Sequence, residues 1–205
     1  MNKKDLFEIF RIDDLIHLPE AVMRVIDMPL EERDAVYMRL LEHAGHDVSY
    51  DWFEKIYMEE LSNRKDHAQF FTPPAVGEVL AGIADAGKGP IHEPAAGTGG
   101  LVIKLWGHRM RKYLPWDFRP SENMVNCWEI SDRSVPLLLL NLSIRGMMGY
   151  VYHGDTPEQK VKMKYILLNR KDDPLGFSEV IKDKEGNKWI QMLPGQGRQK
   201  EEGKS

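Results

Sequence analysis

The sequence has very little cysteine and no long hydrophobic run. Its 205 residues include one cysteine, Cys127, so an internal disulfide framework is excluded. No apolar stretch approaches the roughly 20 residues that cross a bilayer. The first residues, MNKKDLFEIFRIDD, are too acidic and too interrupted for a secretory signal. These absences predict a cytoplasmic protein with no membrane-spanning segment.

Two kinds of chemical site are also poorly represented. His43 and His46 share a helical face, but no Cys or third His accompanies them, so we expect no metal site. The glycine-rich segment around Gly97 is not followed by Gly-Lys-Ser or Gly-Lys-Thr, which argues against a loop for nucleoside triphosphates.

Charge is distributed unevenly along the chain. Residues 1–66 contain 9 Lys or Arg against 16 Asp or Glu, whereas residues 67–205 contain 19 against 16. An acidic N-terminal part is not expected to lie on the phosphates of a nucleic acid, but the mildly basic remainder can approach them.

Hydrophobic spacing divides the chain into a helical lobe (1–66), an alternating domain (67–193) and a flexible tail (194–205). Apolar residues recur at helical intervals in the lobe, which predicts helices over 20–28, 30–47 and 50–63. The second part alternates strands with helices, and a hairpin is expected over 178–193. Its predicted strands are 91–94, 126–130, 150–155 and 164–169, and its predicted helices are 100–114 and 135–146. This order favours an α/β fold with a parallel, doubly wound sheet.

The segment IHEPAAGTGG, residues 91–100, follows the first of these strands and leads into its helix. Ligands of doubly wound sheets bind outside the carboxyl ends of the strands, and glycines there let a ligand approach the backbone. Glu93 at the strand end suits a cationic group better than a phosphate, which favours S-adenosylmethionine (SAM) over NAD. A tight turn in any α/β protein is the alternative interpretation.

Two further acids stand at strand ends. Glu129 ends the second strand, where a carboxylate can accept hydrogen bonds from both ribose hydroxyls, and Asp155 ends the third. Carboxylates at buried strand ends cost desolvation energy unless donors meet them. Three such acids at one edge therefore indicate a ligand site.

Four segments in this order resemble the catalytic domain of N6-adenine DNA methyltransferases, and most of all the modification subunit of type I restriction systems. They are QFFTPPAVGEVL, IHEPAAGTGG, CWEISDRSVPLLLLNLSIRGMMG and VYHGDT, spread over about residues 67–156. The resemblance implies a class I SAM-dependent, Rossmann-type fold with a parallel sheet, here shortened at its C-terminal end and preceded by the helical lobe.

The resemblance also implies roles for the matching positions. Phe71, Thr72 and Pro73 would close over the methionine end of SAM, Glu129 would hold its ribose and Asp155 its adenine. The amino-acid part would lie against Glu93 and the loop that follows it, which contains Pro94, Ala95, Ala96, Gly97 and Gly99. Asn141 and Arg145, on the second helix, are interpreted as solvated or helix-capping positions.

The fourth motif departs from the family pattern. In the family a strand runs into Asn-Pro-Pro-Phe/Tyr, whose Asn oxygen and Pro carbonyl accept from the target amine while the aromatic ring stacks on the flipped base. Here the sequence reads KYILLNRKDDPLGF, so Asn169 is the candidate catalytic residue, and Arg170, Lys171 and Asp172 replace the rest. Asn169 merely ending a strand is the alternative.

Only 36 residues follow Asn169, too few for the usual seven-stranded sheet and a target recognition domain. Two functions therefore stay open. One is a SAM-dependent adenine-N6 DNA methyltransferase that is minimal or depends on a partner, such as a specificity-type subunit, to engage DNA. The other is a catalytically impaired SAM-binding protein that acts by binding a protein or DNA.

Overall fold

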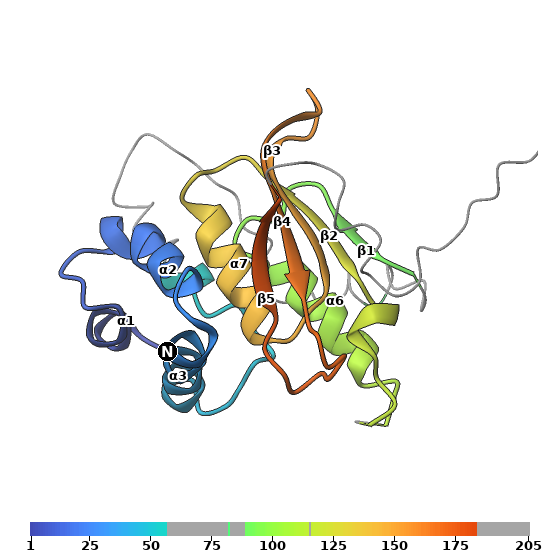
Figure 1. Cartoon of the computed structure of the whole chain (residues 1–205), viewed down its shortest axis with the longest axis horizontal. Coiled ribbons are helices and arrows are strands. Elements are labelled where there is room, and N and C mark those ends of the chain that lie inside the picture. The colour runs from blue at the N-terminus through green and yellow to red at the C-terminus, as the bar shows by residue number, and fades with distance from the viewer. Residues whose placement is uncertain (57–81, 83–88, 115, 184–205) are drawn as a thin grey trace, which may run out of the picture.

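The computed structural model describes residues 1–56, 82, 89–114 and 116–183 as N-terminal helices followed by a five-stranded sheet (Figure 1). The helices of the first part are α1 (Lys3–Phe10), α2 (Leu18–Ile26) and α3 (Leu30–His43). The strands are β1 (Ile91–Glu93), β2 (Val125–Glu129), β3 (Gly149–Asp155), β4 (Lys160–Leu168) and β5 (Glu179–Asp183). Helix α6 (Gly100–Met110) joins β1 to β2, and helix α7 (Ser134–Ile144) joins β2 to β3. Short 3-10 turns lie at Leu15–His17 and Pro120–Glu122.

The N-terminal helices form where the sequence spacing predicts them. Helices α2 and α3 confirm the helices expected over 20–28 and 30–47, and the third expected helix extends beyond residue 56, outside the described residues. Helix α1 begins at a capping box in which the side chain of Asn2 accepts from the Asp5 N–H and Asp5 accepts from the Asn2 N–H. None of the helices in the described ranges has the length and hydropathy needed to cross a membrane.

The sheet has the order β1-β2-β3-β4-β5, and its strands do not all run the same way. β1, β2 and β3 are parallel, but β4 pairs antiparallel with β3, and β5 pairs antiparallel with β4. The α/β, methyltransferase-like class is therefore confirmed, whereas the prediction of a wholly parallel, doubly wound sheet is wrong. Consecutive strands lie side by side throughout this sheet, so the strand order has no reversal point.

Connection length explains the two reversed strands. Only residues 156–159 separate β3 from β4, and a parallel crossover needs a dozen or more residues. The ten residues between β4 and β5 are also too few for a crossover and contain no helix. The short connections therefore allow only hairpin pairing.

Helix α7 lies at the centre of the layered structure, between α2 and the sheet (Figure 1). All of its residues are buried, and one continuous hydrophobic core includes side chains of α1, α2, α3, α6, α7 and the sheet. The domain boundary predicted at residue 66 lies outside the described residues. Up to residue 56, however, the N-terminal part shares its core with the sheet rather than forming a core of its own.

Close packing at the start of β3 requires a glycine. Gly149 has a φ of 138°, and a Cβ placed on it would lie 1.9 Å from the carbonyl oxygen of Val125 on the neighbouring strand. Gly107 on α6 contrasts with it, because a Cβ there would meet only the end of the Arg111 side chain, at 3.7 Å.

We expect Gly149→Ala to lower the free energy of unfolding by about 3 kcal/mol or more, because the added methyl collides with backbone. The matched control Gly107→Ala should be neutral or stabilising by up to about 1 kcal/mol, because alanine is the better helix former. Urea titration followed by circular dichroism measures both. Equal stability of the two variants would contradict the packing described at β3.

Candidate cofactor site

Three acidic side chains end the three parallel strands at one edge of the sheet. Glu93 is the last residue of β1, Glu129 of β2 and Asp155 of β3. The register pairs Glu93 with Cys127 and Glu129 with His153, so each strand extends two residues beyond the previous one. The acids therefore form a staggered row along the carboxyl edge, as the sequence predicts.

The loop after β1 is tied to this edge by its backbone. The Ala96 N–H donates to the carbonyl of Trp128 at 2.8 Å, and the Thr156 hydroxyl donates to the carbonyl of Pro94 at 2.7 Å. Gly97 and Gly99 have φ angles of 56° and 104°, and a Cβ on Gly99 would lie 3.0 Å from Leu138 Cδ1. Glycine is needed here for the left-handed backbone and for close packing on α7.

Glu129 connects the loop to β2. One of its carboxylate oxygens accepts from the Gly97 N–H at 2.7 Å, and the other accepts from the Ser131 N–H at 2.8 Å. Its side chain is nearly completely buried. Because each carboxylate oxygen has two lone pairs, these two bonds leave acceptor capacity for the ribose hydroxyls that the resemblance assigns to this position.

Glu93 has a different environment. Burial raises the pKa of this partly buried carboxyl, and the hydrogen bond from the Ala95 N–H, at 3.2 Å, opposes the shift. A carboxylate that is desolvated in this way gains from a cationic ligand group. The environment of Glu93 therefore fits the ammonium group of an amino-acid moiety and does not fit a phosphate.

Asp155 is partly buried at the far end of the row, beyond the loop. One of its oxygens accepts from the Glu158 N–H at 3.1 Å, which shapes the β3–β4 turn. The next residue, Thr156, holds Pro94. Asp155 and the loop thus lie at one edge of the sheet, where the Asp155 carboxylate could accept a hydrogen bond from an adenine amino group.

Sequence reasoning missed a buried residue that supports this loop. Asp51, in the N-terminal part, accepts from the Thr98 hydroxyl at 2.5 Å and from Asn141 Nδ2 at 2.7 Å. Asn141 Nδ2 also donates to the Thr98 carbonyl at 2.8 Å. Asn141 is completely buried, so the expectation that it is a solvated or capping residue is wrong. The hydrogen bonds among Asp51, Thr98 and Asn141 therefore hold the loop on the side that faces α7 and the N-terminal part.

Arg145 extends this network along α7. Its guanidinium donates to Asn141 Oδ1 at 2.9 Å and to the carbonyls of Val48 and Tyr50 at 2.8 and 2.6 Å. It also lies 4.8 Å from the ring centroid of Trp52. Burial lowers the pKa of Arg145 to about 10, against the attraction of Asp51 and Asp47. Arg145 is therefore also a buried, internally paired residue rather than a solvated one.

The structure places Asn169 at the opposite edge of the sheet. β4 runs antiparallel, and Leu167 pairs with Gly149 at the start of β3, six residues from Asp155. Asn169 lies two residues beyond Leu167, so about eight residues, or about 26 Å along the strands at about 3.3 Å per residue, separate it from Asp155. The expectation that Asn169 faces the cofactor loop is wrong, because the short β3–β4 turn reverses the strand that carries it.

Asn169 and the residues after it have structural partners. Asn169 Nδ2 donates to the carbonyls of Gly146 and Asp173 at 3.0 and 2.7 Å. Arg170 pairs with Glu179 through two bonds, at 2.6 and 2.9 Å, and Asp172 accepts from Ser121. These contacts fix the β4–β5 connection.

The predicted lid residues and the aromatic ring that follows the altered fourth motif, Phe177, remain to be placed. Phe71, Thr72 and Pro73 lie outside the described residues, so their predicted role over the methionine end stays a prediction. Phe177 packs edge-to-face against Tyr37, with ring centroids 5.2 Å apart, on the side of the N-terminal helices. It is therefore not placed to stack on a base at the acidic edge.

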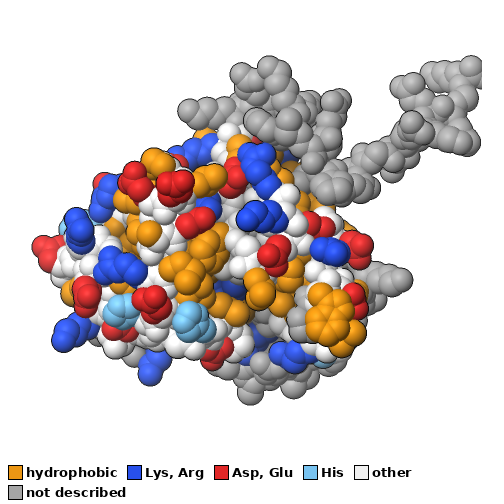
Figure 2. Space-filling model, turned by 60° about the horizontal axis from the view of Figure 1, so that its bottom comes forward, with side chains coloured by type: hydrophobic (Ala, Val, Ile, Leu, Met, Phe, Trp, Pro, Cys, Tyr) orange, Lys and Arg blue, Asp and Glu red, His pale blue; other side chains and the backbone are white. Residues whose placement is uncertain are grey.

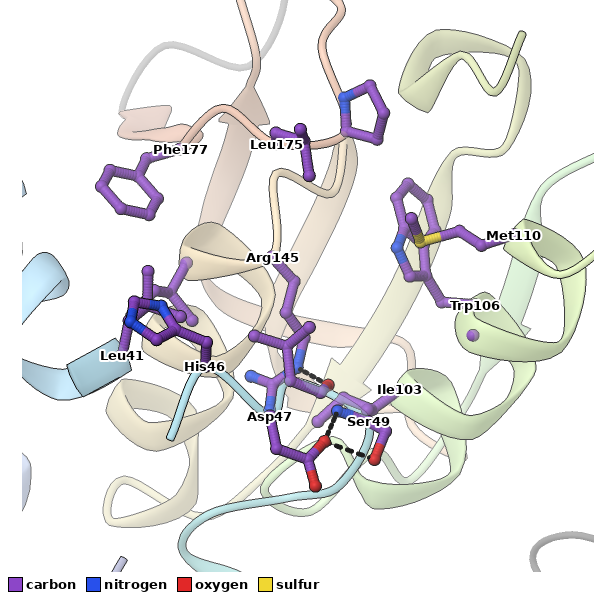
Figure 3. Close-up of a pocket in the computed structure, with 14 residues that line it drawn as sticks. Leu41, His46, Asp47, Ser49, Ile103, Trp106, Met110, Arg145, Leu175 and Phe177 are labelled. Carbon is purple, nitrogen blue, oxygen red and sulfur yellow. Dashed lines mark hydrogen bonds between the residues drawn. The ribbon is translucent and has the colours of Figure 1, made fainter. Parts of the chain in front are cut away.

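A pocket lies away from the acidic row, near the C-terminal ends of α6 and α7 (Figure 3). This pocket of about 450 Å³ lies between Leu41 and His46 on one side and Trp106 and Met110 on the other, with Leu175 and Phe177 beyond them. Hydrophobic side chains also gather on the face of the molecule that is lowest in Figure 1 (Figure 2). Arg145 is among the residues that line this pocket, and its hydrogen bond to Asn141 connects the region to the network behind the cofactor loop.

Comparison with known proteins agrees with this geometry. The family model described as N-6 DNA Methylase matches residues 46–174, which is more than half of the chain. The matched range includes Asp51, the glycine loop and all three acids of the carboxyl edge. Neither a curated protein nor a solved structure matches the chain. The match over 46–174 shows that the chain belongs to the N6-adenine DNA methylase family.

Proposed function

We propose that the chain binds SAM at the carboxyl edge of β1, β2 and β3 and serves adenine-N6 methylation of DNA together with a partner. The observation that carries the proposal is the tie between Glu129 and the Gly97 N–H, which fixes the glycine loop beside the row of three acids. Bound SAM would supply an electrophilic methyl group to this edge.

The fit to SAM is argued from the charges of the site. Glu93 would meet the ammonium group of the amino-acid moiety, because its desolvated carboxyl otherwise has only the Ala95 N–H. Glu129 would accept from the ribose and Asp155 from the adenine amino group. All three side chains of this row are acids, so they would repel a pyrophosphate rather than neutralise its charge.

Dependence on a partner follows from the position of Asn169. Transfer to the exocyclic amine needs hydrogen-bond acceptors that draw the amine lone pair toward the methyl group, and preorganised contacts of this kind are worth about 10²–10³ in rate. By the strand register, Asn169 lies about 26 Å along the strands from Asp155. A specificity-type subunit, as in the type I systems that the sequence resembles, would supply DNA recognition.

A second candidate function is a SAM-binding protein without transferase activity. The same displacement of Asn169 favours it, since the bonds to Gly146 and Asp173 give that side chain a purely structural role. The two functions share cofactor binding and differ only in methyl transfer.

The pH dependence of cofactor binding tests the role of Glu93. The pKa of this carboxyl is raised above its ordinary value of 4.5 by burial, and only its ionised form attracts an ammonium group. Affinity for S-adenosylhomocysteine should therefore be full at neutral pH and should fall as the pH drops through this raised pKa. Glu93→Gln should bind about tenfold more weakly at neutral pH and lose this pH step, because a loss of about 1.4 kcal/mol is a factor of ten. Calorimetric titration between pH 4.5 and 8 measures both, and an unchanged step in the variant would refute the assignment.

Asp155→Ala and Asn169→Ala form a matched pair at opposite edges of the sheet. Asp155→Ala should weaken S-adenosylhomocysteine binding by about 1–3 kcal/mol, because a buried hydrogen-bond partner is lost. Asn169→Ala should leave binding unchanged but lower the free energy of unfolding by about 1–3 kcal/mol, since the Gly146 and Asp173 carbonyls lose their donor. Calorimetry measures the binding and urea titration measures the stability. Weaker cofactor binding by Asn169→Ala would show that Asn169 belongs to the cofactor site.

Methyl transfer distinguishes the two candidate functions. We expect the isolated chain to bind cofactor but to transfer little label from radioactive SAM to unmethylated DNA, and activity to appear when a specificity-type subunit is added. Failure to bind SAM at millimolar concentration would remove the cofactor proposal. Fast transfer by the chain alone, abolished by Asn169→Ala, would show that the partner is unnecessary.

A further inference from the structure

Asp51 is a buried carboxylate that no step of the proposed function uses. It is 6% exposed, and its carboxylate is met by four donors. These are the Thr98 hydroxyl, Asn141 Nδ2 and the N–H groups of Phe53 and Glu54, at 2.5, 2.7, 2.9 and 3.3 Å. Burial raises the pKa of Asp51 above its ordinary value, whereas the hydrogen bonds from Thr98, Phe53 and Asn141 and the attraction of the Arg145 guanidinium oppose this shift and favour the ionised form.

We propose that Asp51 is a positioning residue for the cofactor loop, and that its carboxylate disfavours ligands that carry a phosphate. The proposal rests on the proposed function, since it concerns the same loop. Thr98 lies between the two left-handed glycines, and both its hydroxyl and its carbonyl are held, one by Asp51 and the other by Asn141. The loop can therefore move only if this pair of contacts breaks.

The charge argument concerns the start of α6. The exposed N–H groups and the dipole of a helix N-terminus ordinarily attract phosphate. A Cβ placed on Gly100, the first residue of α6, would lie 3.5 Å from Glu54 Oε2 and 3.8 Å from Asp51 Oδ2. Two carboxylates of the protein itself thus lie beside the start of α6, where they would repel a bound phosphate. Within the described ranges, Arg145 attracts Asp51 and Lys104 attracts Glu54, and Arg145 is also bonded to backbone carbonyls.

Charge and geometry can be separated by two substitutions. Asp51→Asn removes the charge but keeps the shape, because the Thr98 hydroxyl can rotate to accept from the new amide group. Thr98→Val keeps the charge but removes the bond between loop and carboxylate. Glu54→Gln is a third variant that removes a neighbouring charge at a partly buried position, where no effect on folding is expected.

The experiment is calorimetric titration of the full-length chain and each variant with adenosine, ADP and S-adenosylhomocysteine. Adenosine and ADP share the nucleoside, so the ratio of their dissociation constants reports on the diphosphate alone. The unaltered chain should bind ADP more weakly than adenosine. In Asp51→Asn the dissociation constant of ADP divided by that of adenosine should be about tenfold smaller than in the unaltered chain, and in Glu54→Gln it should fall by a smaller factor. Thr98→Val should instead weaken the binding of all three ligands by a similar factor and leave this ratio unchanged. Thermal unfolding checks that each variant is folded.

The outcomes separate this inference from the proposed function. An unchanged ADP-to-adenosine ratio in both charge variants, or equal binding of ADP and adenosine by the unaltered chain, overturns the inference. If S-adenosylhomocysteine still binds in that case, the proposed function stands. If it does not bind but Asp51→Asn gains affinity for ADP, the inference stands and the proposed function falls. If no ligand binds any folded variant, both fall.

Discussion

The complete burial of α7 is the constraint on which the rest of the structure depends. All eleven residues of this helix are buried, although two residues of its C-terminal half, Asn141 and Ser143, carry polar groups. An unpaired polar group at such a position costs about 1–3 kcal/mol, so each needs a partner from an adjacent layer. Asn141 takes Asp51 and Thr98, and the Ser143 hydroxyl lies 2.8 Å from the Tyr37 hydroxyl. The N-terminal part therefore supplies partners for the buried polar groups of α7 through Asp51 and Tyr37, while the Ser143 hydroxyl also donates to the Leu140 carbonyl of its own helix at 3.1 Å.

This requirement places the cofactor loop on a rigid support. The loop is held in front by Glu129, through the Gly97 N–H, and behind by Asp51, through Thr98. Both holding groups are carboxylates and come from segments far apart in the chain. A glycine-rich loop is conformationally free by itself, and these contacts give it one geometry beside Glu93. The acidic N-terminal part thus contributes to the site by fixing the loop.

The features that the sequence predicts correctly are local ones. Strand positions, the glycine loop and the acids at the ends of β1, β2 and β3 follow from residue order, because parallel strands joined by helices present their carboxyl ends at one edge. The bond between Asp51 and Asn141 spans 90 residues, and spacing along the chain does not reveal it. A signal was nevertheless present, since the segment VPLLLLNLSI is apolar on every side of a helix. Such a helix is buried all round, which makes Asn141 a paired core residue rather than a solvated one.

The position of Asn169 shows why motif spacing alone misplaces a catalytic group. It stands 14 residues after Asp155, a distance along the chain that also fits a strand returning to the carboxyl edge. Four residues between β3 and β4 cannot carry the chain back across the sheet, so β4 must run in reverse and deliver its last residue to the opposite edge. The proposed cofactor site lies at the ends of the three parallel strands, so the reversal of β4 leaves its geometry intact. The candidate acceptor Asn169, in contrast, follows the reversed strand, so the reversal moves it away from the proposed site.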